Sequence, residues 1–173
     1  MFTGIVEEIG VVKEFARNSQ GATIKIGCSK VLGGTKIGDS IAVNGICLTI
    51  RTLTNKSIIF EISNETIKYT NIDALNIGKT INLERSLKLS ERIDGHIVSG
   101  HIDGTATIVD VKNDGFSYLF EFKTTETGIL RVMTIFFRIT DVRIKALYIS
   151  RISKNRINIL MKKIFLKKNL KLN

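Results

Sequence analysis

The stretch that decides the fold is residues 38–49, which read GDSIAVNGICLT. Asn44-Gly45 lies at its centre, and this dipeptide is a common signal for a two-residue hairpin turn. The runs on either side, residues 40–43 and 46–49, are rich in the apolar and β-branched residues that strands favour. The stretch therefore predicts two antiparallel strands joined by a tight turn.

Outward from this hairpin, short alternating runs continue along the first 96 residues. Apolar residues occupy every second position in Ala22–Ile26, Ile58–Ile62 and Ile81–Leu83, as half-buried strands require. Turn signals separate these runs at Gly33-Gly34, Gly38-Asp39, Asn55-Lys56 and Gly78-Lys79. The spacing predicts an antiparallel barrel or sandwich. One short helix is expected at 65–69, with Ser63 or Asn64 as its cap.

Composition places the chain among globular proteins. It has 173 residues, of which 43% are hydrophobic, enough for a core. No amino-terminal signal segment and no apolar run of roughly 20 residues is found, so the expected compartment is the cytoplasm and no membrane partner is expected. The two cysteines, Cys28 and Cys47, form no CxxC pair and predict reduced thiols.

Charge is distributed unevenly along the chain. The net charge is +10, and the residues from Arg131 onward contain 12 Lys and Arg against a single acid, Asp141. No glycine follows Gly128, and proline is absent from the whole sequence. This basic tail is compatible with a solvated helix face, an RNA-binding arm or sequence under no functional constraint. We favour the last interpretation and expect no nucleic-acid partner.

An internal repeat is indicated by two similar stretches. Residues 4–7, GIVE, resemble residues 100–103, GHID, and each is followed by small and β-branched residues. Two tandem barrels are therefore expected. The counterpart of residues 44–49 should fall near 140–145, where the sequence is TDVRIK instead. The second copy begins and then loses its pattern.

Five separated blocks, in order, resemble riboflavin synthase. The blocks are residues 1–8 (MFTGIVEE), 38–49 (GDSIAVNGICLT), Glu65-Thr66 followed by Thr70-Asn71, 81–85 (INLER) and 95–104 (GHIVSGHIDG). The resemblance covers residues 1–110 strongly and residues 111–134 weakly.

This resemblance implies an all-β protein built from six-stranded Greek-key barrels. The first lumazine-binding barrel would comprise residues 1–96. Residues 97–173 would form a second, degenerate or truncated copy, with its pattern lost after about residue 134. Residues 149–173 fit a C-terminal amphipathic helix, with Ile152, Ile159, Leu160 and Ile164 apolar among basic residues, and fit a disordered tail equally well.

The resemblance also implies a reaction, the last step of riboflavin biosynthesis. Two molecules of 6,7-dimethyl-8-ribityllumazine exchange a four-carbon unit, which gives riboflavin and 5-amino-6-(ribitylamino)uracil. No metal and no organic cofactor takes part. Active sites would lie between the first barrel of one subunit and the second barrel of a neighbour, in a homo-oligomer that is a trimer in the family.

The family's functional positions can be carried over to this sequence. Ser40, Cys47 and His101 match polar positions near the reacting ring and are the expected catalytic residues. The expected substrate-binding residues are Gly4, Ile5, Val6, Cys47, Leu48, Thr49, Glu61, Ile62, Ser63, Asn64, Glu65, Thr66, Gly100, His101 and Ile102.

Each of these residues also has a simpler interpretation. Cys47, taken alone within an apolar strand, is more often a buried structural thiol. His96 and His101 are suitably spaced for a metal pair, but no third ligand is near them in the sequence. Glu65 and Thr66 fit the first turn of a helix, where an acid interacts favourably with the helix dipole. Only their neighbours in the sequence give these residues a functional interpretation.

Two functions of other classes remain open. The first is a non-catalytic lumazine- or flavin-binding protein that uses the first barrel alone, or an inactive, degenerate synthase. The second is a nucleic-acid-binding protein, an interpretation that depends only on the basic tail.

Overall fold

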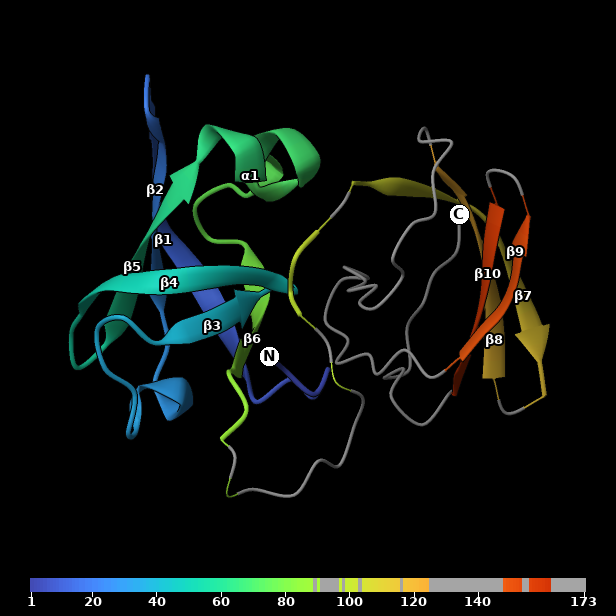
Figure 1. Ribbon diagram of the computed structural model, residues 1–173, viewed down its shortest axis with the longest axis horizontal. Helices are drawn as coiled ribbons and strands as arrows, with labels where there is room; N and C mark the ends of the chain where they lie inside the picture. Colours follow the sequence, from blue (N-terminus) through green and yellow to red (C-terminus); the bar gives the residue numbers. More distant parts are fainter. Residues whose placement is uncertain are drawn as a thin grey trace.

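The computed structural model describes residues 1–88, 90, 97, 99–102, 104–115, 117–124, 148–153 and 156–162. Its first part is a closed antiparallel barrel with the strand order β1-β2-β5-β4-β3-β6 (Figure 1). The barrel strands are β1 (Glu8–Asn18), β2 (Gly21–Gly27), β3 (Ser40–Val43), β4 (Ile46–Leu53), β5 (Ser57–Ser63) and β6 (Thr80–Arg85). The predicted six-stranded antiparallel barrel is therefore confirmed.

The hairpin predicted from Asn44-Gly45 joins β3 to β4. Both turn residues have positive φ, +47° for Asn44 and +88° for Gly45, as a type I′ turn requires. Asn44 also holds the turn to β6, because its Oδ1 accepts a hydrogen bond of 2.8 Å from the Asn82 amide. The hairpin is thus fixed both by local geometry and by a contact with a distant strand.

Within the fully described residues 1–88, three short helical segments connect the barrel strands. These are the 3-10 turns η1 (Lys30–Leu32) and η2 (Ile72–Ala74) and the helix α1 (Asn64–Tyr69). Ser63 caps α1, since its hydroxyl accepts a hydrogen bond of 3.1 Å from the Thr66 amide. The predicted helix at 65–69 and its cap are both confirmed. Among the described residues, no helix has the length and apolar character needed to cross a membrane.

The barrel core is filled by alternate residues of the six strands. Its fully buried side chains include Ile24, Ile26, Ile41, Ile58 and Phe60. Each strand therefore presents its other residues on the outer face of the barrel, where a ligand can reach them.

Residues after the barrel form a four-stranded antiparallel sheet in the order β7-β8-β10-β9. The strands are β7 (Ala106–Asp114), β8 (Ser117–Thr124), β9 (Tyr148–Ser153) and β10 (Arg156–Lys162). Phe120 and Phe122 are buried in this sheet, with their rings stacked at a centroid distance of 6.3 Å. The proposed division at residue 96 stays a prediction, and the region around residue 134 lies outside the described residues.

The helix expected within residues 149–173 is wrong for the described residues, which form β9 and β10 there. In β10, Ile157 and Ile159 pair with Phe122 and Phe120 of β8. β-branched residues favour strands, and the backbone pairing of β10 with β8 outweighs the helical spacing of the apolar residues. Ile164 lies outside the described residues.

Candidate functional site

The outer face of β3, β4 and β6 carries the residues on which the site depends. In the strand register, Ala42 of β3 lies between Cys47 of β4 and Glu84 of β6. On β3, Ser40 lies two positions before Ala42 and therefore on the same face, and it pairs with Thr49 of β4. Two of the three expected catalytic residues, Ser40 and Cys47, thus share this face.

The segment Gly100–Ile102 lies against the same face. The Cys47 amide donates a hydrogen bond of 2.9 Å to the Gly100 carbonyl oxygen. Gly100 has a φ of +76°, and a Cβ added to it would lie 2.9 Å from both the Cys47 Cβ and the Phe2 Cε2. His101 is exposed, while Ile102 packs against the barrel core. The structure therefore brings Cys47 together with the predicted closing segment.

The predicted segment 61–66 occupies the end of β5 and the start of α1. Ile50 pairs with Phe60, so the next residues, Thr49 and Glu61, are neighbours on adjacent strands, and both are exposed. Glu61 already forms an exposed ion pair of 3.3 Å with Arg51. Asn64 donates its amide to the Ser19 carbonyl at 3.0 Å. Ser63 and Glu65 are exposed, and Thr66 is half-buried.

Two predicted binding residues have their side chains in the barrel core. Leu48 is 4% exposed and Ile62 is 3% exposed, and both belong to the core cluster. Their alternation with Cys47, Thr49 and Glu61 requires this inward orientation. Any contact of Leu48 or Ile62 with a ligand on the outer face would therefore involve the backbone, not the side chain.

The predicted residues 4–6 lie beside β6. A pocket of about 470 Å³ is lined by Ile5 and also by Ser40, Glu84 and Arg85. Gly4 is held through its amide, which donates a hydrogen bond of 3.0 Å to Glu84 Oε1. Val6 is half-buried. Residues 4–6 thus share with Ser40 the β6 side of β3, whereas Cys47 lies on the β4 side.

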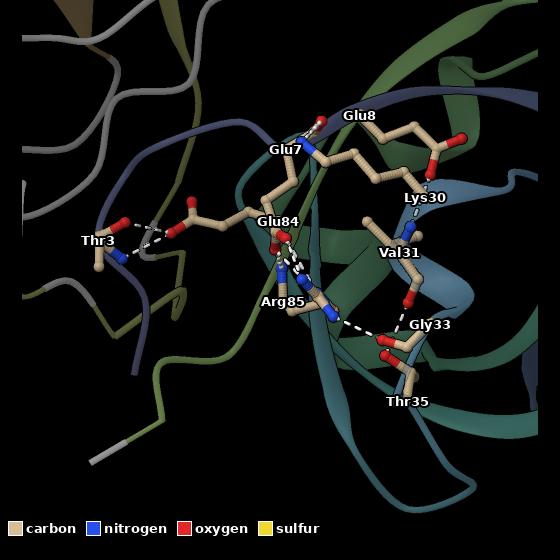
Figure 2. Close-up of polar contacts among 9 residues, drawn as sticks. All are labelled: Thr3, Glu7, Glu8, Lys30, Val31, Gly33, Thr35, Glu84 and Arg85. Carbon is tan, nitrogen blue, oxygen red and sulfur yellow. Dashed lines mark hydrogen bonds and ion pairs between the residues drawn. The ribbon is translucent and has the colours of Figure 1, made fainter. Parts of the chain in front are cut away.

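Glu84 is a buried polar residue that the sequence patterns did not reveal. It is only 3% exposed. Its Oε1 accepts hydrogen bonds from the Thr3 amide at 2.6 Å and the Thr3 hydroxyl at 3.0 Å (Figure 2). Oε1 also accepts one from the Gly4 amide, whereas Oε2 has no partner in the described part of the chain. Burial raises the pKa of Glu84, and the hydrogen bonds from Thr3 and Gly4 offset this only in part.

The neighbouring residue Arg85 joins the barrel end to the loop after η1. Its guanidinium donates to both carboxylate oxygens of Glu7 and, at 2.7 Å, to the Gly33 carbonyl (Figure 2). Burial alone would raise the pKa of Glu7, but the hydrogen bonds and positive charge of Arg85 outweigh burial and lower it. Both carboxylate oxygens of Glu7 therefore accept hydrogen bonds from Arg85, whereas only Oε1 of Glu84 has a partner in the described part of the chain.

The raised pKa of Glu84 predicts a pH dependence of stability. The folded state binds the Glu84 proton more tightly than the unfolded state, so this contribution is present below the ordinary glutamate pKa of about 4.3 and is lost as the pH rises through the folded value. Glu84→Gln removes the titration. Denaturant unfolding, measured as the pH rises above about 4.3, should show the free energy of unfolding of the wild type falling relative to that of Glu84→Gln. Parallel pH dependences of the two proteins would contradict the raised pKa of Glu84.

Metal ligands are not gathered in the described part of the chain, where no group of three His, Cys, Asp or Glu residues is suitably placed for a metal ion. His96, the second member of the histidine pair, lies outside the described residues. What the site offers is one thiol, hydroxyls, a histidine and backbone amides on an apolar barrel wall. Such groups suit an uncharged heterocycle with many hydrogen-bonding atoms.

Comparisons with known proteins agree with the barrel. A family model described as Lumazine binding domain matches residues 3–86. The riboflavin synthase of Bacillus subtilis (strain 168) is 40% identical over 123 residues, which cover 71% of this chain and 57% of that protein. The riboflavin synthase of Schizosaccharomyces pombe (strain 972 / ATCC 24843) is 39% identical over 132 residues, which cover 76% of this chain and 64% of that protein.

A solved structure shares the fold. The crystal structure of LumP complexed with 6,7-dimethyl-8-(1'-D-ribityl) lumazine superposes with a TM-score of 0.73 at 24% identity, covering 94% of this chain and 87% of that one. The two curated relatives above are matched over 57% and 64% of their own lengths.

Proposed function

We propose that the first barrel binds 6,7-dimethyl-8-ribityllumazine, because residues 3–86 match the lumazine-binding domain model and the chain is similar to riboflavin synthases. The observation that carries this proposal is the contact of Cys47 with Gly100, which places the strand with Cys47 and Thr49 beside the segment that ends in His101 and Ile102. The heterocycle would lie beside this contact, against the outer face of the strand and next to His101.

The polar groups at this place fit the ligand. Exposed Thr49, half-buried Thr66 and nearby backbone amides would bind the pyrimidinedione edge and the ribityl chain, both of which are rich in hydrogen-bonding atoms. Ser40, Cys47 and His101 would lie near the reacting ring. A mixed polar and apolar surface of this kind orients a flat heterocycle without requiring charge neutralisation.

The proposed reaction is the dismutation of two lumazine molecules to riboflavin and 5-amino-6-(ribitylamino)uracil. The 7-methyl protons of the donor are acidic because the ring delocalises the resulting carbanion, so a weak base and a polar environment for the anion suffice. Holding two heterocycles face to face supplies much of the remaining rate enhancement. No metal is required for either step.

The second heterocycle requires a second binding surface. We assign it to a neighbouring subunit, so the proposed enzyme is a homo-oligomer, a homotrimer by analogy with the family, in the cytoplasm. The pairing of first and second barrels across subunits would then complete each site.

The experiment uses the purified full-length chain and 6,7-dimethyl-8-ribityllumazine. Absorbance and fluorescence of riboflavin should grow with time and in proportion to protein concentration. A folded barrel that binds lumazine and yields no riboflavin would refute the catalytic part of the proposal.

Substitutions of the residues proposed to lie near the reacting ring separate effects on catalysis from effects on binding. We expect His101→Gln to lower kcat by about tenfold, a modest general-base effect because the methyl protons are already acidic, while the Kd for lumazine changes less. Cys47→Ser should act in the same direction. Cys28→Ser is the control, since Cys28 packs against the barrel core and belongs to no part of the proposed site. Equal losses in kcat and affinity would indicate that His101 and Cys47 only pack in the site and take no part in catalysis.

A second candidate function is non-catalytic binding of a lumazine or flavin. The observation that favours it is that residues 8–85 close the barrel by themselves. Quenching of ligand fluorescence on binding, without any product, would support this candidate over the synthase.

A further inference from the structure

The first four residues form an arm, residues 1–4, that lies across the outer face of the barrel. One end is held by the Leu87 amide, which donates a hydrogen bond of 2.9 Å to the Met1 carbonyl. The other end is held by Glu84, whose Oε1 accepts the three hydrogen bonds from Thr3 and Gly4. The arm is thus attached on both sides of Phe2.

Phe2 connects the arm to the proposed ligand site. Its side chain is fully buried and packs with Ala42 and Cys47. Its ring also lies against Gly100, where an added Cβ would come within 2.9 Å of Phe2 Cε2. A continuous series of contacts therefore runs from Glu84 through the arm to Gly100, directly before His101.

We infer that Glu84 is a positioning residue, which holds the arm so that Phe2 supports Gly100–Ile102 against Cys47. This inference rests on the proposed function, because it assigns to Glu84 a role in shaping the lumazine site. Glu84 is not among the residues proposed to touch the ligand. It acts through Thr3, Gly4 and Phe2.

The chemistry of Glu84 suits this role better than a role in fold stability alone. A buried carboxyl whose Oε2 finds no partner among the described residues carries a desolvation cost that an apolar residue would avoid. An apolar residue, however, could not accept hydrogen bonds from the arm. Oε1 retains its acceptor capacity whether or not the carboxyl is protonated, so the arm stays attached in both states.

The test uses the two cysteines of the full-length chain as local probes. Iodoacetamide labelling of Cys47 and Cys28 is followed separately by peptide mass spectrometry. In Glu84→Ala we expect Cys47 to react about tenfold faster than in the wild type, as loss of several hydrogen bonds allows, and Cys28 to react at an unchanged rate. Equal acceleration of both thiols would overturn the inference, because Glu84 would then serve the barrel as a whole.

Two further variants sharpen the result. Glu84→Gln keeps an acceptor oxygen, so its Cys47 rate should stay within about twofold of the wild type. The matched control is Glu8→Ala. Glu8 accepts hydrogen bonds from the Ser29 and Val31 amides next to Cys28, and burial together with the Glu8 charge raises the pKa of Cys28 to about 11. Glu8→Ala should therefore accelerate Cys28 and not Cys47.

Ligand binding provides the functional readout. The Kd for 6,7-dimethyl-8-ribityllumazine should weaken by about tenfold in Glu84→Ala and stay near the wild-type value in Glu84→Gln and Glu8→Ala. Accelerated Cys47 labelling with an unchanged Kd would overturn the role in the site. Absence of lumazine binding in the wild type would instead refute the proposed function, and the labelling pattern would still decide whether Glu84 holds the arm.

Discussion

Gly100→Ala is expected to weaken binding of 6,7-dimethyl-8-ribityllumazine by at least about tenfold, because two costs add at this residue. An alanine at a φ of +76° is strained by its Cβ. The new Cβ would also lie 2.9 Å from the Cys47 Cβ and the Phe2 ring, and neither neighbour is the free end of a flexible side chain. The segment carrying His101 should therefore move away from Cys47. Fluorescence titration of the ligand measures the loss.

The matched control for Gly100 is Gly78→Ala. Gly78 has a φ of +84°, and an added Cβ there meets nothing within 4 Å. The backbone cost is thus nearly the same, about 1–2 kcal/mol, without the clash. Gly78→Ala should lower stability and leave the ligand affinity unchanged. Similar affinities in the two variants would show that Gly100 does not shape the site.

Gly21→Ala should give the largest loss of stability, at least about 3 kcal/mol in the free energy of unfolding. A Cβ at Gly21 would overlap the Ile62 carbonyl oxygen, and the φ of +147° is also unfavourable for alanine. Backbone atoms cannot rotate away as a side chain can. Gly21 pairs with Ser63, so the end of β5 and the cap of α1 should be displaced together.

Denaturant unfolding of Gly21→Ala and Gly78→Ala, followed by circular dichroism, tests this prediction. Gly78→Ala should lose about 1–2 kcal/mol, from backbone strain alone. Loss of comparable size in both variants would mean that β2 and β5 separate easily at Ser63. In that case the start of α1 would not be held rigidly enough to position a ligand.

Local features of the fold could be predicted from the sequence. Asn44-Gly45 predicts its turn because few other residue pairs tolerate two positive φ angles. Ser63 predicts the start of α1 because its hydroxyl satisfies an amide that the helix leaves free. These signals involve residues close together in the chain, so no knowledge of the rest of the fold is needed.

Long-range contacts could not be predicted in the same way. Glu84 occupies an outward position of β6, and a charged residue there normally indicates an exposed face. It is covered by a segment about 80 residues earlier in the chain, where Thr3 and Gly4 donate hydrogen bonds to it. The strands β9 and β10 could not be predicted for a related reason, because β10 pairs with Phe120 and Phe122 of the distant strand β8, and β9 pairs with β10. The proximity of Cys47 to Gly100 was expected only from the family resemblance.

We place lumazine against the outer face of β4, beside the contact of Cys47 with Gly100. Ligand protection of Cys47 tests this placement most directly. The rate of Cys47 alkylation should fall at least about tenfold at saturating 6,7-dimethyl-8-ribityllumazine, as expected when a ligand covers a reactive group. Cys28 should react at the same rate throughout. Saturation of ligand fluorescence with no change in the Cys47 rate would contradict this placement of the ligand.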